Sequence, residues 1–283
     1  MIPIKGYSTF DPLKHCIVGR GQDPKNATGS LQDIMYSTEE DLQSLIKVLE
    51  SLGVVCYRPN NNANSERPPI SPRDYFVVLG EELLVGKMIA GYDDILKSID
   101  RKGIKWYLSS DISSANMIRC GKHIHWDISK LLPKELETEI TAYLRFNKKY
   151  NLSVTRYGWH MDGLYSIVKP GVIVAVKELK ELPLIYPKWD ICYLDQQQID
   201  KPIEHEWGGN YNESNYDVNI LSVDQENCIV ANENQTLFKF LEKHKINPIV
   251  SPFRNKAFWD NGIHCITQDL YREGEMIDYI GKQ

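Results

Sequence analysis

The order of the predicted secondary-structure elements constrains the fold of this chain most, because one set of elements recurs along it. Each copy is a β-hairpin followed by a helix and one further strand. The predicted hairpins cover residues 76–85, 117–126 and 219–231, the helices 93–102, 133–148 and 236–245, and the strands 105–108, 153–157 and 248–251. Turn residues and apolar runs support the hairpins, and helical spacing supports the helices. The chain is therefore predicted to be an α/β protein.

Strands without a partner nearby in the sequence are expected close to both ends of the chain. They cover residues 15–19 and 263–270. After the first of them, Thr38-Glu-Glu-Asp41 is typical of a helix cap, an apolar helical pattern follows, and a strand is expected at 54–58. Pairing the two outer strands would close the units into a ring.

One domain is expected over residues 1–283. The polar stretches 60–69 and 210–215 are loops too short to separate domains. A further hairpin is expected to start near His160 and to include residues 172–176.

Composition argues against several classes of function. The 283 residues carry a formal net charge of −5 and no basic tract, so a nucleic-acid partner is not indicated. No apolar run reaches the ~20 residues of a membrane span, and the first residues do not resemble a signal peptide. The six cysteines are scattered without a Cys-x-x-Cys pair, which favours reduced, buried thiols in a cytoplasmic protein.

The motifs give no reason to expect a cofactor. The sequence contains neither Gly-x-Gly-x-x-Gly nor a P-loop, so neither a dinucleotide nor a nucleoside triphosphate is implied. His123-Ile-His125 lacks a third ligand at a sensible spacing, so these residues are interpreted as strand histidines and no metal site is expected.

Cys265 is the candidate nucleophile. It follows Asp260-Asn261-Gly262, a strong turn signal, and is expected at the start of a strand near a loop edge. A functional thiol needs its pKa lowered from ~8.5 by a nearby cation or by oriented amides. His160, or the positive charge of a substrate, could supply this effect. The alternative interpretation of Cys265 as a buried core thiol stays open.

His160 and Asp162 alternate along a predicted strand, so their side chains are expected to share one face. They could lie at the mouth of a buried hairpin or at an exposed strand end. Asp74 precedes an apolar strand and, taken alone, is an ordinary loop acid. His264 would face away from Cys265 in a strand, which favours a structural role. Further candidates for substrate binding are Asn219, Gly262 and His264.

Six landmarks along the chain, in order and with similar gaps, resemble the amidinotransferases, which include glycine amidinotransferase and enzymes acting on aminocyclitols. The landmarks are Phe10-Asp11-Pro12-Leu13 with Ile17-Val18-Gly19-Arg20, Pro72-Arg73-Asp74, Ala115-Asn116 with Arg119-Cys120-Gly121, His160-Met161-Asp162, Arg254-Asn255, and Gly262-Ile263-His264-Cys265 with Asp269. The resemblance implies a five-unit α/β propeller, the pentein fold, built of ββαβ modules with pseudo-fivefold symmetry.

The resemblance also implies a reaction. In the family a cysteine attacks the guanidinium carbon of a donor, usually arginine. Ornithine is released and an amidino-cysteine remains. A primary amine then attacks this intermediate. At the matching positions Cys265 would be the nucleophile, His160 the acid and base, and Asp74 and Asp162 the carboxylates that hold the guanidinium. The implied substrates are small molecules, no cofactor or metal is implied, and relatives are often homodimers.

The chain departs from the family at two positions. Ser113 aligns with the aspartate that orients the family histidine, and Asp111, two residues upstream, could replace it. The arginine that binds a substrate carboxylate in the glycine enzyme aligns near Leu179. Residues that could substitute for it are Lys177, Lys180 and Arg254. Two alternatives to transfer therefore stay open: a guanidine hydrolase of the arginine deiminase type, and a catalytically weakened guanidinium-binding protein.

Overall fold

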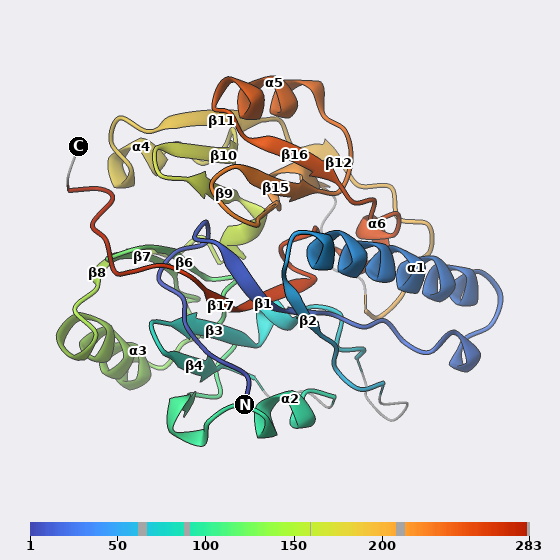
Figure 1. Ribbon diagram of the computed structural model, residues 1–283, viewed down its shortest axis with the longest axis horizontal. Helices are drawn as coiled ribbons and strands as arrows, with labels where there is room; N and C mark the ends of the chain where they lie inside the picture. Colours follow the sequence, from blue (N-terminus) through green and yellow to red (C-terminus); the bar gives the residue numbers. More distant parts are fainter. Residues whose placement is uncertain (62–66, 88–90, 159, 208–212, 282–283) are drawn as a thin grey trace.

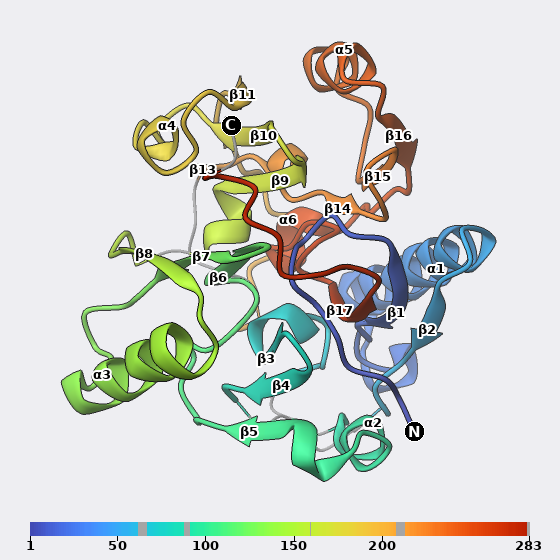
Figure 2. The same cartoon turned by 60° about the vertical axis from the view of Figure 1, so that its left-hand side comes forward.

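The structure, a computed structural model, describes residues 1–61, 67–87, 91–158, 160–207 and 213–281. The loops predicted at 60–69 and 210–215 lie partly outside these ranges. Short sheets lie towards the middle of the molecule, and the longer helices lie at its periphery (Figures 1 and 2). This confirms the prediction of a mixed α/β protein.

Four sheets repeat one pattern in chain order: an antiparallel strand pair and a third strand parallel to the second. Their strands are β3 (Phe76–Leu79), β4 (Glu82–Val85) and β5 (Ile104–Trp106); β6 (Met117–Cys120), β7 (His123–Asp127) and β8 (Asn151–Thr155); β9 (Tyr165–Lys169), β10 (Val172–Val176) and β11 (Asp190–Leu194); and β14 (Leu221–Ser222), β15 (Asn227–Val230) and β16 (Asn247–Val250). The parallel strand follows a helix in each: α2 (Asp93–Lys97), α3 (Lys134–Ala142), α4 (Leu182–Ile185) and α5 (Gln235–Lys243). The predicted hairpin, helix and strand order is confirmed.

A fifth sheet of the same pattern joins segments from opposite ends of the chain. Strand β17 (Thr267–Arg272) runs antiparallel to β1 (Leu13–Val18), and β2 (Val55–Tyr57) runs parallel to β1 after helix α1 (Gly29–Ser51). The predicted pairing of the two outer strands is confirmed.

Short elements complete the described fold. They are the 3-10 turns η1 (Pro24–Asn26), η2 (Pro72–Asp74), η3 (Arg101–Gly103), η5 (Met161–Gly163) and η6 (Tyr216–Val218), the π-helical turn η4 (Tyr143–Asn147), the helix α6 (Lys256–Trp259), and the two-stranded ribbon of β12 (Gln197–Gln198) and β13 (Glu213–Ser214).

Several predicted boundaries are wrong. Helix α1 starts after Thr28, whereas Thr38 lies buried inside the helix, where its hydroxyl accepts hydrogen bonds from Trp259 Nε1 at 2.9 Å and Asn255 Nδ2 at 3.1 Å. The helices predicted at 93–102 and 133–148 each divide into an α-helix and a tighter or wider turn. These differences come from tertiary contacts, which override local signals.

Helix α1 shows how the periphery packs on a sheet. Its apolar residues Leu42, Leu45 and Leu49 are buried in one cluster with Cys16 and Val18 of β1.

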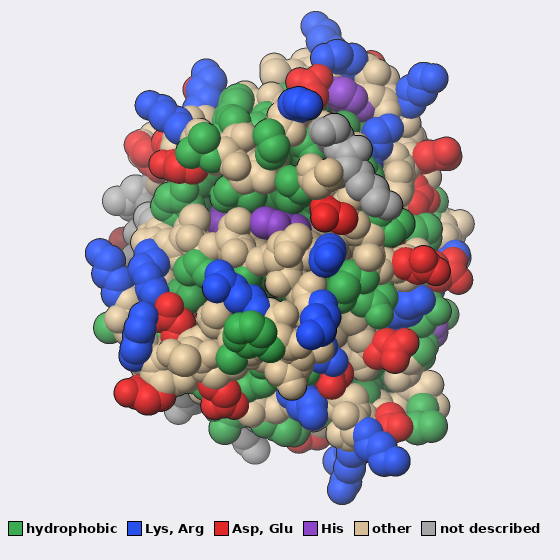
Figure 3. Space-filling view, turned by 90° about the vertical axis from the view of Figure 1, so that its left-hand side faces the viewer, with side chains coloured by type: hydrophobic (Ala, Val, Ile, Leu, Met, Phe, Trp, Pro, Cys, Tyr) green, Lys and Arg blue, Asp and Glu red, His purple; other side chains and the backbone are tan. Residues whose placement is uncertain are grey.

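All six cysteines are free thiols, and all but Cys56 are buried. On the face shown in Figure 3, basic and acidic side chains are interspersed. Of the helices in the described ranges, none combines the length and apolar character that crossing a bilayer requires.

A buried ion cluster joins three segments of the fold. Asp269 of β17 accepts hydrogen bonds from Arg73 Nη1 at 2.7 Å, from Arg119 Nη2 and from Arg272 Nε at 2.9 Å. These four side chains are at most 1% exposed. Burial alone would raise the pKa of Asp269, but the three guanidinium groups hold that pKa well below its ordinary value. A carboxylate on the last strand thus ties together η2, β6 and β17.

Replacing Asp269 should lower the free energy of unfolding more than a substitution of an exposed residue does. Asp269→Asn leaves three buried guanidinium groups without their shared anion, and breaking a buried pair in this way costs about 3–5 kcal/mol. Urea unfolding should show this loss. Glu273→Gln, which removes the exposed Lys14–Glu273 pair, is the control and should change stability by less than about 0.5 kcal/mol. Equal stabilities of the two variants would contradict the importance of the cluster.

Candidate active site

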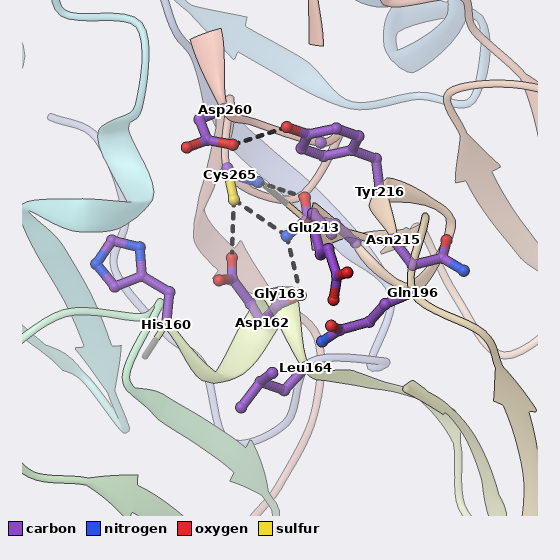
Figure 4. A pocket seen from close by; sticks show the side chains of 13 residues that line it. His160, Asp162, Gly163, Leu164, Gln196, Glu213, Asn215, Tyr216, Asp260 and Cys265 are labelled. Carbon is purple, nitrogen blue, oxygen red and sulfur yellow. Dashed lines mark hydrogen bonds between the residues drawn. The ribbon is translucent and has the colours of Figure 1, made fainter. Parts of the chain in front are cut away.

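One cavity brings together residues that lie far apart in the sequence. It is lined by η5 and the residues beside it, by β13 and η6, and by the turn before β17. The cavity and the open solvent at its mouth together hold about 600 Å³ of empty space. Cys265, Asp162 and His160 all line it, as Figure 4 shows.

Cys265 is held on a turn that the sequence did not predict. Strand β17 starts at Thr267, because the Thr267 hydroxyl donates to the carbonyls of Ile263 and His264, both at 3.0 Å, and residues 263–266 form a turn. The prediction that Cys265 and His264 lie in a strand and face opposite ways is therefore wrong. Both side chains contact Asp162 instead.

Asn219 fixes the thiol from two sides. Its side-chain oxygen accepts the Cys265 amide N–H at 3.0 Å, and its Nδ2 donates to Cys265 Sγ at 3.0 Å and to the Asp162 carbonyl at 2.9 Å. Gly262 allows this close approach, since a Cβ there would lie 2.5 Å from Asn219. Asn219 and Gly262, expected to bind substrate, thus have a structural part in positioning the thiol.

Asp162 is the centre of the polar network. It is fully buried, and its Oδ2 accepts from His264 Nδ1 at 2.8 Å and from Cys265 Sγ at 3.4 Å. Burial and the charge of Arg73 lower the pKa of His264 to about 4, so an uncharged imidazole protonated at Nδ1 is the donor at neutral pH. Burial alone would raise the pKa of Asp162, but the hydrogen bond from His264 and the charge of Arg73 outweigh it. Asp162 is therefore a carboxylate.

Four buried carboxyl oxygens lack a hydrogen-bond partner among the described residues: Asp11 Oδ2, Asp260 Oδ2, Asp162 Oδ1 and Asp74 Oδ1. The last two belong to the acids predicted to hold a guanidinium. Asp74 ends η2, and the two acids are close enough that Asp162 raises the pKa of Asp74, although burial is the larger cause. Buried acceptors without partners are costly. These two oxygens are therefore the natural place for a cationic donor of several N–H groups.

His160 lies beside Asp74. Its Nδ1 is 3.6 Å from Asp74 Oδ1, just beyond a hydrogen bond, and its side chain is 47% exposed. It precedes η5, so the prediction that His160 and Asp162 alternate along a strand is wrong. In this turn Asp162 points into the protein and His160 stays at the cavity wall (Figure 4).

The free thiol of Cys265 is not activated. Burial raises its pKa well above the ordinary value, and the negative charges of Asp162 and Asp74 raise it further. Hydrogen bonds from the Gly262 backbone and the Asn219 amide act in the opposite direction but do not offset this. The lowered pKa expected from His160 is thus absent in the free protein, and a bound cation would favour the thiolate.

Five predicted site residues are not among those that line the cavity. Two of them lie directly behind the lining: Asp74 beside His160, and His264 bound to Asp162. The other three have their contacts elsewhere. Asp111 accepts from the backbone and hydroxyl of Ser129 at 2.7 and 3.1 Å, which holds the segment after β7. Ser113 is buried, and its hydroxyl has no partner among the described residues. Arg254 binds Asp41 and Glu40 of α1, at 2.8 and 2.7 Å. None of the three is positioned against His160 or the thiol.

The sequence interpretation missed the side of the cavity formed by β13 and η6. Tyr216 donates its hydroxyl to Asp260 at 2.7 Å, and Glu213 and Gln196 line the wall beyond it. Asp260 was visible as part of the turn before Cys265. Glu213 and Gln196 lie in polar segments that carry no recognisable motif, so the sequence offered no signal for them.

Comparison with known proteins confirms the expected resemblance to the amidinotransferases. The L-arginine:L-lysine amidinotransferase of Pseudomonas savastanoi pv. phaseolicola is 22% identical over 88% of this chain and 82% of its own length. The mitochondrial glycine amidinotransferase of Xenopus laevis is 20% identical over 98% of this chain and 85% of its own. No protein-family model matches the chain.

The fold agrees with a solved structure. Inosamine-phosphate amidinotransferase StrB1 from Streptomyces griseus superposes with a TM-score of 0.79, covering 99% of this chain and 100% of that one at 19% identity. At this identity the likeness shows a common fold.

The pH dependence of thiol alkylation tests the electrostatics of the site. Because burial and two carboxylates raise the pKa of Cys265, its alkylation by iodoacetamide should rise with a midpoint above the ~8.5 of free cysteine. Asp162→Asn removes one negative charge and should move the midpoint to lower pH. Asp93→Asn, at an exposed acid of α2, is the control and should leave it unchanged. Mass spectrometry of the labelled Cys265 peptide gives the rates; an unshifted midpoint in Asp162→Asn would reject this account.

Proposed function

We propose that the protein is an amidinotransferase, which moves an amidino group from a guanidino donor to a primary amine. Arginine is the first donor to test, and the transfer passes through a covalent amidino-cysteine. The observation that carries the proposal is the pair of unpartnered carboxyl oxygens on Asp74 and Asp162 beside the Cys265 thiol. The curated relatives support an amidinotransferase enzyme, and five sheets of one ββαβ pattern support the expected five-unit propeller in a single domain.

The donor guanidinium would bind between the two acids. A planar guanidinium donates paired hydrogen bonds to carboxylates, so Asp74 and Asp162 can fix its plane and direct its carbon at the Cys265 sulfur. Its positive charge also opposes the two negative charges that keep the thiol protonated. Donor binding thus lowers the cost of forming the thiolate, and the nucleophile is activated only when a substrate is present.

Two half-reactions then balance. In the first, the Cys265 sulfur bonds to the guanidinium carbon, the bond from that carbon to the donor amine breaks, and the thiol proton leaves with the amine. In the second, an acceptor amine bonds to the amidino carbon, the carbon–sulfur bond breaks, and the amine proton returns to the thiolate. No cofactor or metal enters this scheme.

His160 would carry the protons. It lines the same cavity, and its exposed ring can exchange protons with solvent between the half-reactions. Asp74, at 3.6 Å, is the acid that can orient it. Asp74 would therefore orient His160 in this protein, because Ser113 has no carboxylate and Asp111 binds Ser129 instead.

The nucleophile assignment predicts a covalent intermediate. Protein incubated with arginine should gain the mass of one amidino group on the Cys265 peptide, and Cys265→Ala should show neither this adduct nor ornithine release. Cys56→Ala, which changes a half-buried thiol of β2, is the control and should keep both. Ornithine release by Cys265→Ala at the normal rate would remove Cys265 from the reaction.

Product analysis separates transfer from the alternatives. Guanidinylated amine appearing only when an amine is added means transfer, whereas citrulline formed without added amine means hydrolysis. Binding of arginine without any product over hours would favour a weakened binding protein.

The proposed role of His160 predicts that its replacement impairs the chemical step more than substrate binding. His160→Asn removes the proton carrier while leaving the guanidinium-binding carboxylates, so kcat should fall about 10²–10⁴-fold with a much smaller change in KM. Asp74→Asn should instead raise the KM for the donor as well, because one of the two binding acids is lost. Steady-state kinetics of the two variants give the comparison. A His160→Asn enzyme with unchanged kcat at every pH would contradict the role.

A further inference from the structure

The cavity wall away from His160 is acidic. Among the described lining residues the charged side chains are His160, Asp162, Glu213 and Asp260, and none is a lysine or arginine. Figure 4 shows His160 on one side of Asp162 and Cys265, and Glu213, Gln196 and Asn215 on the other. A substrate whose guanidinium lies at Asp162 and Asp74 would therefore extend its remaining chain towards Glu213.

Glu213 is the exposed acid on this wall. It lies on β13, whose partner β12 follows the lining residue Gln196, and its carboxylate accepts a hydrogen bond from the Gln198 amide across the ribbon. A neutral amide donor positions the carboxylate but does not cancel its charge. Glu213 therefore presents a negative charge at the far end of the cavity.

Two of the three basic residues that the sequence suggested for a substrate carboxylate, Lys177 and Arg254, pair with acids outside the cavity lining. Lys177 pairs with Asp195 at 2.5 Å, and Arg254 pairs with two acids of α1. Leu179 is buried in the core, so the position that aligns with a carboxylate-binding arginine contributes no charge. Lys201 lies 4.0 Å from Asp260 Oδ2, and the charges of Lys201 and Arg67 both act on Asp260.

The charges of the wall thus favour one class of substrate. A carboxylate at this end of a substrate would meet Glu213 as a like charge, which is a repulsive element of specificity. An ammonium group would meet an opposite charge. We propose that Glu213 is a specificity-determining residue that selects substrates bearing an amino group, and no carboxylate, at the end remote from the reacting group. This inference rests on the proposed function for the guanidinium end of the cavity.

The same wall would serve both half-reactions, because the donor product leaves before the acceptor enters. The donor class is then the ω-guanidinoalkylamines, and the acceptor class is the diamines. Arginine fits partly, since its α-amino group can meet Glu213 while its carboxylate gains no partner. Glycine offers only one amine, which must react, and a carboxylate that the wall repels.

Binding to Cys265→Ser protein tests the inference without turnover. The probes are agmatine, which is arginine without its carboxylate, and 5-guanidinopentanoate, which is arginine without its α-amino group. Calorimetry should show agmatine binding at least about tenfold more tightly, which corresponds to ~1.4 kcal/mol. Glu213→Gln should reduce this ratio, and Glu213→Lys should reverse it. Glu242→Gln, an exposed acid on α5, is the matched control and should keep it.

Each outcome has a distinct meaning. If 5-guanidinopentanoate binds as tightly as agmatine, or if Glu213→Gln keeps the ratio, the inference falls while the proposed function stands. If neither guanidine binds, the guanidinium site itself is wrong and the proposed function falls with it. Far-UV circular dichroism of the Glu213 variants checks that they are folded. With wild-type enzyme, putrescine should discharge the amidino-cysteine at least about tenfold faster than glycine, and equal rates would overturn the acceptor class.

Discussion

The contact between Asp269 and three buried arginines is the interaction on which the site depends. Arg73 binds Asp269 and also donates its Nε to the carbonyls of His264 and Thr267, at 3.0 and 2.8 Å. The first carbonyl belongs to the turn that holds the thiol, the second to the start of β17, and Arg73 directly precedes Asp74. One guanidinium thereby fixes the distance between the nucleophile and an acid proposed to hold its target. The proposed chemistry would thus rely on an ion pair that lies outside the cavity lining.

The same cluster explains how so many charges can be buried together. Three arginines and Asp269 leave an excess of two positive charges, and the charge of Arg73 favours the ionised forms of Asp74 and Asp162, although burial leaves the pKa of Asp74 raised. The hydrogen bond from His264, with a smaller contribution from the charge of Arg73, keeps Asp162 ionised without any substrate. A bound guanidinium adds one positive charge, and ionisation of the thiol removes it again. Charge balance is thus kept at each stage of the proposed reaction.

Local signals in the sequence were enough for the hairpins. The turn at Gly80 and the one at Gly121 were placed correctly because tight turns depend on the residues within them. The start of α1 and the orientation of His264 could not be predicted, because both depend on distant partners: Trp259 for Thr38, and Arg73 for the turn at 263–266. Glu213 was missed for a similar reason, because the function of a single acidic residue in a loop can be inferred only from the cavity that it lines.

The pairing of β1 with β17 has a consequence for how the protein matures. These strands join segments separated by nearly the whole length of the chain, and closing so long a loop is entropically costly and slow. The turn with Cys265 lies directly before β17, so the thiol gains its neighbours only when this seam closes. A chain in which this seam is open has Asp74 and Asp162 without an aligned sulfur. Under the proposed function such a chain would be inert towards guanidines, so catalytic competence would mark the completion of folding.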